Sequence, residues 1–187
     1  MSNEYKDWEK DLIEEETQIV KKYPFLHIRD IDGTLDVHTK FPLMALEIPD
    51  GWHKVFFQMC DDIMPLLEEE GVMDKFYFIQ VKEKYNNLVC YSNGAASQRV
   101  EDIISKYEEM AYYICTQCGK PATCMTTGYW ASLCDDCWKD NLRYMEVKQI
   151  DFLPEYNVTE FSNGKRVEKT ISFEDEWNRY LKGLCDY

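Results

Sequence analysis

The chain lacks the features that mark secreted, membrane-spanning and nucleotide-processing proteins. Its opening residues, MSNEYKDWEKDL, are charged, and no long apolar run occurs in its 187 residues. Neither a signal peptide nor a membrane span is therefore expected, which predicts an intracellular protein. The motifs GxxxxGK, GxGxxG, HExxH and GxSxG are also absent, so the sequence leans away from a conventional enzyme without deciding the question.

Positive charge is scarce. The chain has 21 Lys and Arg residues against 35 Asp and Glu residues, a net charge of -14 at pH 7. Such a protein repels phosphate backbones, so direct nucleic-acid binding is not expected, although a local basic patch would permit it. The acidity either keeps the protein soluble, which we favour, or mimics a nucleic acid in the basic groove of another protein.

Apolar and aromatic residues are plentiful by comparison. Hydrophobic residues make up 45% of the chain, which includes 13 Tyr, 9 Phe and 5 Trp. This content is enough to build a core and argues against disorder. The length suits one domain of ordinary size, or a core domain with a small additional module.

Four of the eight cysteines have the spacing Cys115-x2-Cys118-x15-Cys134-x2-Cys137. Two CxxC pairs about fifteen residues apart are typical of a tetrahedral zinc site, and the segment between them is long enough to return as a hairpin. Four sulfur ligands would leave no position for water, so the predicted zinc has a structural role. The alternatives are two disulfides or four unrelated buried thiols.

The other four cysteines have no CxxC partner. Cys60, Cys90, Cys124 and Cys185 are interpreted as core or inert positions, because a reducing compartment disfavours a disulfide framework. Cys124 lies within the predicted ribbon and could compete as a ligand. We rank it below the four paired cysteines.

The hydrophobic pattern predicts an α+β fold in which helices pack on a small antiparallel sheet with an inserted four-cysteine zinc ribbon. Helices are expected at residues 3–22, 51–70, 97–114 and 173–184. Extended segments are expected at 76–84, 88–91, 144–152 and 158–172, the last of them around a turn at Ser162-Asn163-Gly164. Pro65 should kink or divide the second helix. The expected organisation is a core at 1–112, a zinc ribbon at 113–142, and C-terminal strands and a helix at 143–187 that complete the core.

The segment Asp30-Ile31-Asp32-Gly33-Thr34 matches a DxDGT signature that resembles the haloacid-dehalogenase phosphatases. In that family the first Asp is the nucleophile and the second is a general acid. Here the residues before Asp30 are half polar, and no α/β alternation surrounds the motif. A turn that contains glycine explains the same residues without catalysis, so we assign no catalytic residue.

The hairpin predicted at 76–91 carries positive charge in an acidic chain. Strand alternation places Gln80, Lys82 and Lys84 on one face, beside Tyr85. Pairing with acidic neighbours across the strands is the simpler explanation. The alternative is a binding surface for a small phosphate-bearing ligand, formed by these four residues and walled by Trp52.

The order and spacing of motifs in the middle of the chain carry a family resemblance. The motifs are Asp50-Gly51-Trp52, QVKEKY at 80–85, Leu88 to Tyr91, Tyr107-Glu108, CTQCGKP at 115–121, Trp130 and LCDDC at 133–137. In this order they resemble a family of uncharacterised bacteriophage and prophage accessory proteins, over about residues 21 to 137. The chain departs from that family at Asn86-Asn87, where paired glycines are typical, and at Val89, where Arg is frequent.

The resemblance implies a phage accessory protein that acts in the cytoplasm of an infected bacterium. Such proteins commonly bind and block host factors, including components of antiviral defence. The first hypothesis is therefore a zinc-containing protein that binds and inhibits or redirects a host bacterial protein. The alternatives are sequestration of a small nucleotide signal, and a phosphatase or nuclease that uses Asp30 and Asp32. The oligomeric state is left open.

Overall fold

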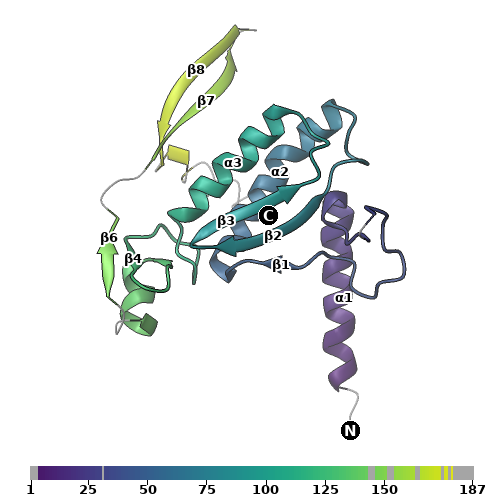
Figure 1. The fold of residues 1–187 in the computed structure, drawn as a ribbon, viewed down its shortest axis with the longest axis horizontal. Helices are drawn as coiled ribbons and strands as arrows, with labels where there is room; N and C mark the ends of the chain where they lie inside the picture. Colours follow the sequence, from purple (N-terminus) through teal and green to yellow (C-terminus); the bar gives the residue numbers. More distant parts are fainter. Residues whose placement is uncertain are drawn as a thin grey trace. The chain divides into compact units, whose positions relative to one another are not determined.

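The computed structural model describes residues 4–30, 32–142, 146–150, 154–162, 165–173, 175–176 and 178 (Figure 1). The chain contains two compact units. The first consists of Met1–Ile48, Met59–Lys84 and Leu88–Ser105, and the second of Pro49–Gln58, Tyr85–Asn87 and Lys106–Tyr187. Within the described residues, no helix has the length and apolar character needed to cross a membrane. The expected division into 1–112, 113–142 and 143–187 stays a prediction.

The first unit contains a three-stranded sheet in the order β1-β2-β3, and Figure 1 shows helices α2 and α3 together on one side of it. The bounds are β1 Leu46–Glu47, α2 His53–Glu69, β2 Phe78–Lys84, β3 Asn87–Ser92 and α3 Gln98–Tyr112. The predicted α+β class is confirmed. The sheet is mixed, however, because β1 runs parallel to β2, with Leu46 opposite Val81. The parallel pairing follows from α2, which crosses over between these two strands.

The predicted hairpin between β2 and β3 is also confirmed. Its two connecting residues, Tyr85 and Asn86, have φ values of 52° and 62°. Positive φ at both central positions is the mark of a type I′ turn, whose twist matches that of the flanking strands. The turn therefore sets the pairing of β2 with β3.

An aromatic group forms part of the core of the first unit. The rings of Phe25, Phe76 and Phe78 are all buried and meet edge to face, with centroids 5.2 to 6.0 Å apart. This geometry is the favoured one for aromatic pairs, because the positive ring edge of one faces the negative ring face of another. The short 3-10 helix η1, Pro24–Leu26, places Phe25 in the group.

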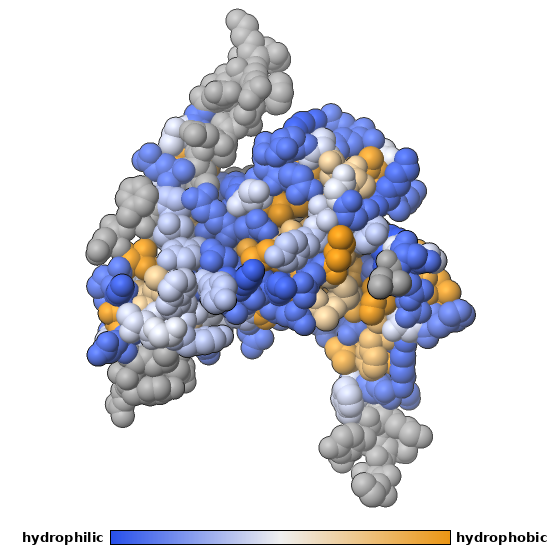
Figure 2. Space-filling view, in the orientation of Figure 1, coloured by the Kyte–Doolittle hydropathy of each residue, from blue (hydrophilic) through white to orange (hydrophobic). Residues whose placement is uncertain are grey.

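Helix α1, Glu4–Lys22, matches the helix predicted at residues 3–22. Its end is tied to α2 by Asp61, whose Oδ1 atom accepts a hydrogen bond from the Tyr23 hydroxyl at 2.8 Å and lies 2.9 Å from Lys22 Nζ. Burial and then the Asp61 contact raise the pKa of Tyr23. The other end of the helix exposes Trp8, and Figure 2 shows apolar surface along α1 and the segment that follows it.

Pro65 was expected to kink or divide α2, and it does not divide the helix. The helix is continuous from His53 to Glu69 with Pro65 inside it. Proline removes one backbone donor, but Met59, Ile63 and Leu67 on the buried side of the helix have no exposed surface. Burial of this face offsets the missing hydrogen bond.

The second unit contains a three-stranded sheet, β5-β4-β6, and a separate two-stranded sheet, β7-β8. The bounds are β4 Cys124–Thr126, β5 Ser132–Leu133, β6 Val147–Gln149, β7 Glu155–Ser162 and β8 Lys165–Ser172. The sequence assigned the strand at 144–152 to the core, whereas the structure pairs β6 with β4 of the ribbon. This pairing satisfies backbone groups along β4 that would otherwise lack partners.

The segment after β8 is anchored to α3. Lys106 Nζ lies 2.8 Å from the buried Glu176 Oε1, and the rings of Tyr113 and Phe173 are 5.8 Å apart. The helix expected at 173–184 lies mostly outside the described residues.

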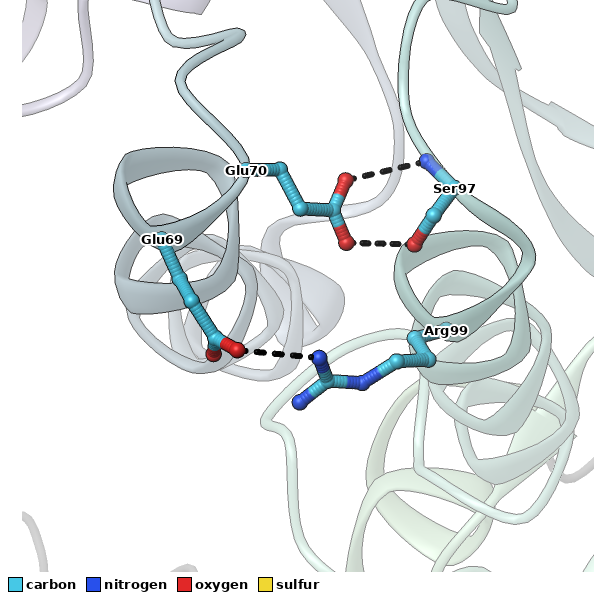
Figure 3. A network of polar contacts seen from close by, with 4 residues as sticks. All are labelled: Glu69, Glu70, Ser97 and Arg99. Atoms are coloured by element: carbon cyan, nitrogen blue, oxygen red, sulfur yellow. Dashed lines mark hydrogen bonds and ion pairs between the residues drawn. The ribbon is translucent and has the colours of Figure 1, made fainter.

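The N-terminus of α3 is held by the residue that follows α2 (Figure 3). Ser97 is the N-cap residue, because its carbonyl accepts the amide hydrogens of Val100 and Glu101. The Glu70 carboxylate accepts hydrogen bonds from both the Ser97 amide, at 3.1 Å, and the Ser97 hydroxyl. A negative charge at this position also interacts favourably with the helix dipole. Glu70 therefore fixes the end of α2 to the start of α3.

The Glu70 contact predicts a measurable difference between two adjacent glutamates. Glu70→Ala should lower the free energy of unfolding by about 1 kcal/mol, the usual cost of a lost helix cap. Glu69→Ala is the matched control, because its ion pair with Arg99 is exposed and should contribute about 0.5 kcal/mol or less. Urea unfolding of both variants measures the difference. Equal losses would show that Glu70 does not act as a cap.

Candidate metal centre

The first CxxC pair, Cys115 and Cys118, lies in a tight turn directly after α3. The Cys115 amide donates to the Lys120 carbonyl at 2.8 Å, and the Gly119 amide donates to the Cys115 carbonyl at 3.0 Å. Gly119 has a φ of 74°, a conformation that glycine adopts without steric cost. The turn thus closes around the first pair, with Cys115 buried and Cys118 exposed.

The second pair, Cys134 and Cys137, lies where β5 leads into the short helix α4, Asp135–Cys137. Cys134 is the N-cap residue in extended conformation, and its carbonyl accepts the Trp138 amide at 3.0 Å. The two turns are joined directly, because the Thr116 amide donates to the Ser132 carbonyl at 2.9 Å. Strand β5 and its bond to Thr116 thus bring the second pair to the first.

The sulfurs of Cys115, Cys118, Cys134 and Cys137 all lie within 4.8 Å of one another. All four cysteines are free thiols, and the Sγ atoms of Cys118 and Cys134 are 3.6 Å apart. Four sulfurs around one ion at bonds of about 2.3 Å would be separated by about 3.8 Å. The cluster therefore has the donors and the spacing to hold a metal ion, and it is not a pair of disulfides.

Burial opposes ionisation of the thiols of Cys115, Cys118 and Cys137. Burial, followed by contacts with Cys118 and Cys134, raises the pKa of Cys137, and burial also raises that of Cys118. At Cys115 burial acts in the same direction, but backbone amides of Cys134, Cys118 and Gln117 together outweigh it and lower the pKa. Amides directed at a sulfur stabilise the thiolate, which is the form that binds metal.

Cys124 lies outside the four-sulfur group. Its side chain is buried, and its sulfur lies 3.6 Å from the carbonyl oxygen of Leu133. Burial raises the pKa of this thiol, which keeps it in the neutral form. Among the described residues, the group that could hold a metal contains the four paired cysteines and not Cys124.

Two residues far away in the sequence support the first turn, a role that sequence reasoning missed. The Gly51 amide donates to the Thr116 carbonyl at 3.1 Å, and a Cβ atom at Gly51 would lie 2.1 Å from the Cys115 carbonyl oxygen. No side chain fits there. The adjacent Trp52 is fully buried, and its indole N–H donates to the Ile114 carbonyl at 3.2 Å.

The second support that sequence reasoning missed is Asn86. Its side chain is fully buried. Its Nδ2 atom donates to the Ser132 hydroxyl oxygen at 2.7 Å, and its Oδ1 atom accepts the Ser132 amide at 2.9 Å. The Ser132 hydroxyl in turn donates to the Tyr112 carbonyl at 2.5 Å. These bonds connect the β2–β3 turn to β5 and to the end of α3. Ser132, where they meet, lies two residues before Cys134.

The residues proposed for ligand binding have other contacts in the structure. Lys82 Nζ donates to Gln80 Oε1 at 2.7 Å and lies 5.4 Å from the centre of the Tyr91 ring, and Gln80 Nε2 donates to Glu47 at 3.2 Å. Gln80 and Lys82 therefore share a face, as expected. Lys84 and Tyr85 are exposed at the hairpin end.

Trp52, the fifth residue of the proposed ligand surface, belongs to the second unit. Its ring has no exposed surface. Its observed role is to support the turn around Cys115 instead of forming the wall of a solvent-accessible pocket.

The DxDGT segment forms a tight turn. The Asp30 amide donates to the Thr34 carbonyl at 2.8 Å, and the Thr34 amide donates to Asp32 Oδ1 at 3.0 Å. Both aspartates are exposed, and hydrogen bonds from Thr34 lower the pKa of Asp32. These contacts are those of an Asx-type turn, in which the carboxylate organises the local backbone.

No family model matches the chain, and neither the curated proteins nor the solved structures include one that is significantly similar to it. The resemblance to phage accessory proteins therefore remains an expectation from the motifs.

The geometry of the cluster predicts which cysteines control metal content. The double variant Cys115→Ser and Cys134→Ser should lose stoichiometric metal and melt at a lower temperature, because metal binding contributes directly to the free energy of folding. Cys124→Ala is the control within the same ribbon and should keep one metal ion per chain. Native mass spectrometry before and after denaturation measures both. Metal retained by the double variant would refute the site.

The Asn86 contacts predict a second difference between neighbours. Asn86→Gly should destabilise the protein by about 1–3 kcal/mol, because it leaves the buried amide of Ser132 without its acceptor and removes the donor to the Ser132 hydroxyl oxygen. Glycine is the chosen replacement since it accepts the positive φ of this position. Asn87→Ala, at an exposed residue, should cost less than about 1 kcal/mol. Thermal unfolding compares the two, and a reversed order would show that the Asn86 bonds are dispensable.

Proposed function

We propose that this chain is a phage accessory protein that binds a host bacterial protein in the cytoplasm and inhibits or redirects it, with antiviral defence as the target process. The observation that carries the proposal is the cluster of four sulfurs within 4.8 Å. Four thiolates fill a tetrahedral coordination sphere and leave no position for a reacting water. A metal held in this way would stabilise the fold of the ribbon, and a ribbon with a fixed conformation can act as a binding surface.

Zinc is the metal that fits this donor set best. Zinc is redox-inactive and prefers four-coordinate tetrahedral geometry. Sites of four cysteines are among its common structural forms. With four thiolates of charge -4 and an ion of charge +2, the loaded site would carry about -2. Such a site adds to the acidity of the chain, whose net charge is already -14.

The charge of the chain supports a protein partner over a nucleic acid. Nucleic-acid binding modules gain most of their affinity from basic residues that neutralise phosphates. Here Lys120 and Lys139, the basic residues closest to the cysteines in the described ribbon, lie 3.2 Å from Asp136 and Asp135. The neighbouring carboxylates compensate the charges of these lysines, which reduces the contribution that they could make to the affinity for a phosphate backbone.

Sequestration of a nucleotide and phosphatase chemistry remain the alternative hypotheses. No contact described above favours the first, because Lys82 is engaged with Gln80 and Tyr91. The second requires a nucleophilic Asp30, which is exposed on a turn. Asp30→Asn would abolish a phosphatase activity and leave protein binding unchanged, so this variant separates the two classes.

Affinity purification from infected bacteria tests the proposed function. Tagged wild-type protein should recover one host protein in stoichiometric amount, and the variant Cys115→Ser with Cys134→Ser should recover much less, because its ribbon has lost its metal. Native mass spectra of the purified chain are the companion measurement. A nucleotide-sized adduct without any recovered protein would reject protein binding in favour of sequestration.

A further inference from the structure

The second unit exposes three aromatic side chains, two of which lie shortly before Cys134 in the sequence. Tyr85 and Tyr129 are each 71% exposed, and Trp130 is 52% exposed. The rings of Tyr85 and Trp130 meet at 6.4 Å with an interplanar angle of 65°. We call Tyr85, Tyr129 and Trp130 the aromatic surface. Large aromatic residues grouped on a surface, and not required by the core, are a common feature of binding sites.

The backbone beneath the aromatic surface is held firmly. The Thr126 hydroxyl donates to the Tyr129 carbonyl, and the Ala131 amide donates to the same hydroxyl at 2.9 Å. On the other side, the buried bonds of Asn86 hold the turn that carries Tyr85. The side chains are thus exposed on a fixed frame. A preorganised surface loses less conformational entropy when a partner binds.

Tyr85 occupies a backbone position that disfavours tyrosine. It is the first central residue of the type I′ turn, with a φ of 52°. Asn, Asp and Gly are preferred there, because a bulky side chain is strained at positive φ. A glycine would suit the fold better. The presence of an exposed aromatic ring at a strained position indicates a role in contact with another molecule.

The charge of the chain identifies the chemistry of that molecule. The net charge of -14 attracts basic partners over long range. Glu146 is exposed. It lies beside the loop that carries Tyr129 and Trp130, because its carbonyl accepts the Thr127 amide at 2.8 Å. Lys84 precedes Tyr85, and its positive charge opposes the attraction of a basic partner locally. This single charge is small beside the net charge of the chain. Aromatic rings on a chain of net negative charge favour arginine, whose planar guanidinium stacks on them.

We propose that the aromatic surface is the docking site for an arginine-rich segment of the partner protein. This inference rests on the proposed function, because it assumes that the partner is a protein. Guanidinium groups would stack on Trp130 and Tyr85, while the acidic chain supplies the long-range attraction. The metal centre and Asn86 would keep the two ring-bearing loops in place.

A short arginine peptide is the probe that tests this surface on the full, metal-loaded chain. NMR titration should shift the indole signal of Trp130, and a lysine peptide of equal length should bind several-fold more weakly. Trp130→Ala should weaken binding of the arginine peptide by about tenfold or more, as expected for a central aromatic contact. Trp8→Ala is the matched control, because Trp8 is also 52% exposed and lies on α1. Unchanged metal content confirms that both variants are folded.

Several results would overturn the inference. They are an unshifted Trp130 signal, equal binding of the arginine and lysine peptides, equal losses in Trp130→Ala and Trp8→Ala, or preferential binding of a single-stranded oligonucleotide. The outcome is separable from that of the proposed function. A host protein recovered equally by wild type and Trp130→Ala would keep the function and reject this surface. Peptide binding at Trp130 without any host partner would keep the surface and reject the function.

Discussion

The second unit depends on the convergence of four cysteine sulfurs to within 4.8 Å. Among the described residues, the buried cluster around them consists of Cys115, Cys124, Leu133 and Cys134, with Cys137, Trp138 and Val147 packed against it. A cluster of this size contributes little free energy to folding, and small modules of this kind usually need a metal or disulfides. The sulfurs are therefore both the ligands of the proposed ion and a large part of the core that it would stabilise.

The ribbon is not a self-contained stretch of sequence. Gly51 and Trp52 support the first cysteine turn, Asn86 holds the strand before the second, and β6 completes the sheet from beyond residue 146. Each contact satisfies a backbone group that would otherwise be buried without a partner. A fragment limited to residues 113–142 would lack these bonds. The four-cysteine cluster is thus supported by segments distributed over about a hundred residues.

The sequence was informative where the signal is local. The CxxC spacing, the amphipathic helices and the hairpin each follow from a repeat or turn preference within about twenty residues, and the structure contains them. The role of Trp52 was missed because the sequence pattern does not distinguish a tryptophan that is buried in the core from one that lines a binding pocket. The role of Asn86 was missed because its partner, Ser132, lies 46 residues away. The pairing of β6 with β4 likewise depends on a long-range contact.

The contact between Gly51 and the Cys115 carbonyl restricts how the sequence can change over evolutionary time. Because a Cβ atom at position 51 would meet backbone oxygen at 2.1 Å, no compensating change of a side chain relieves the clash. Gly51 can therefore be replaced only if the backbone conformation of the CxxCG turn changes at the same time. Divergent homologues that keep the turn should keep this glycine, even where the acidic surface residues around it have been replaced.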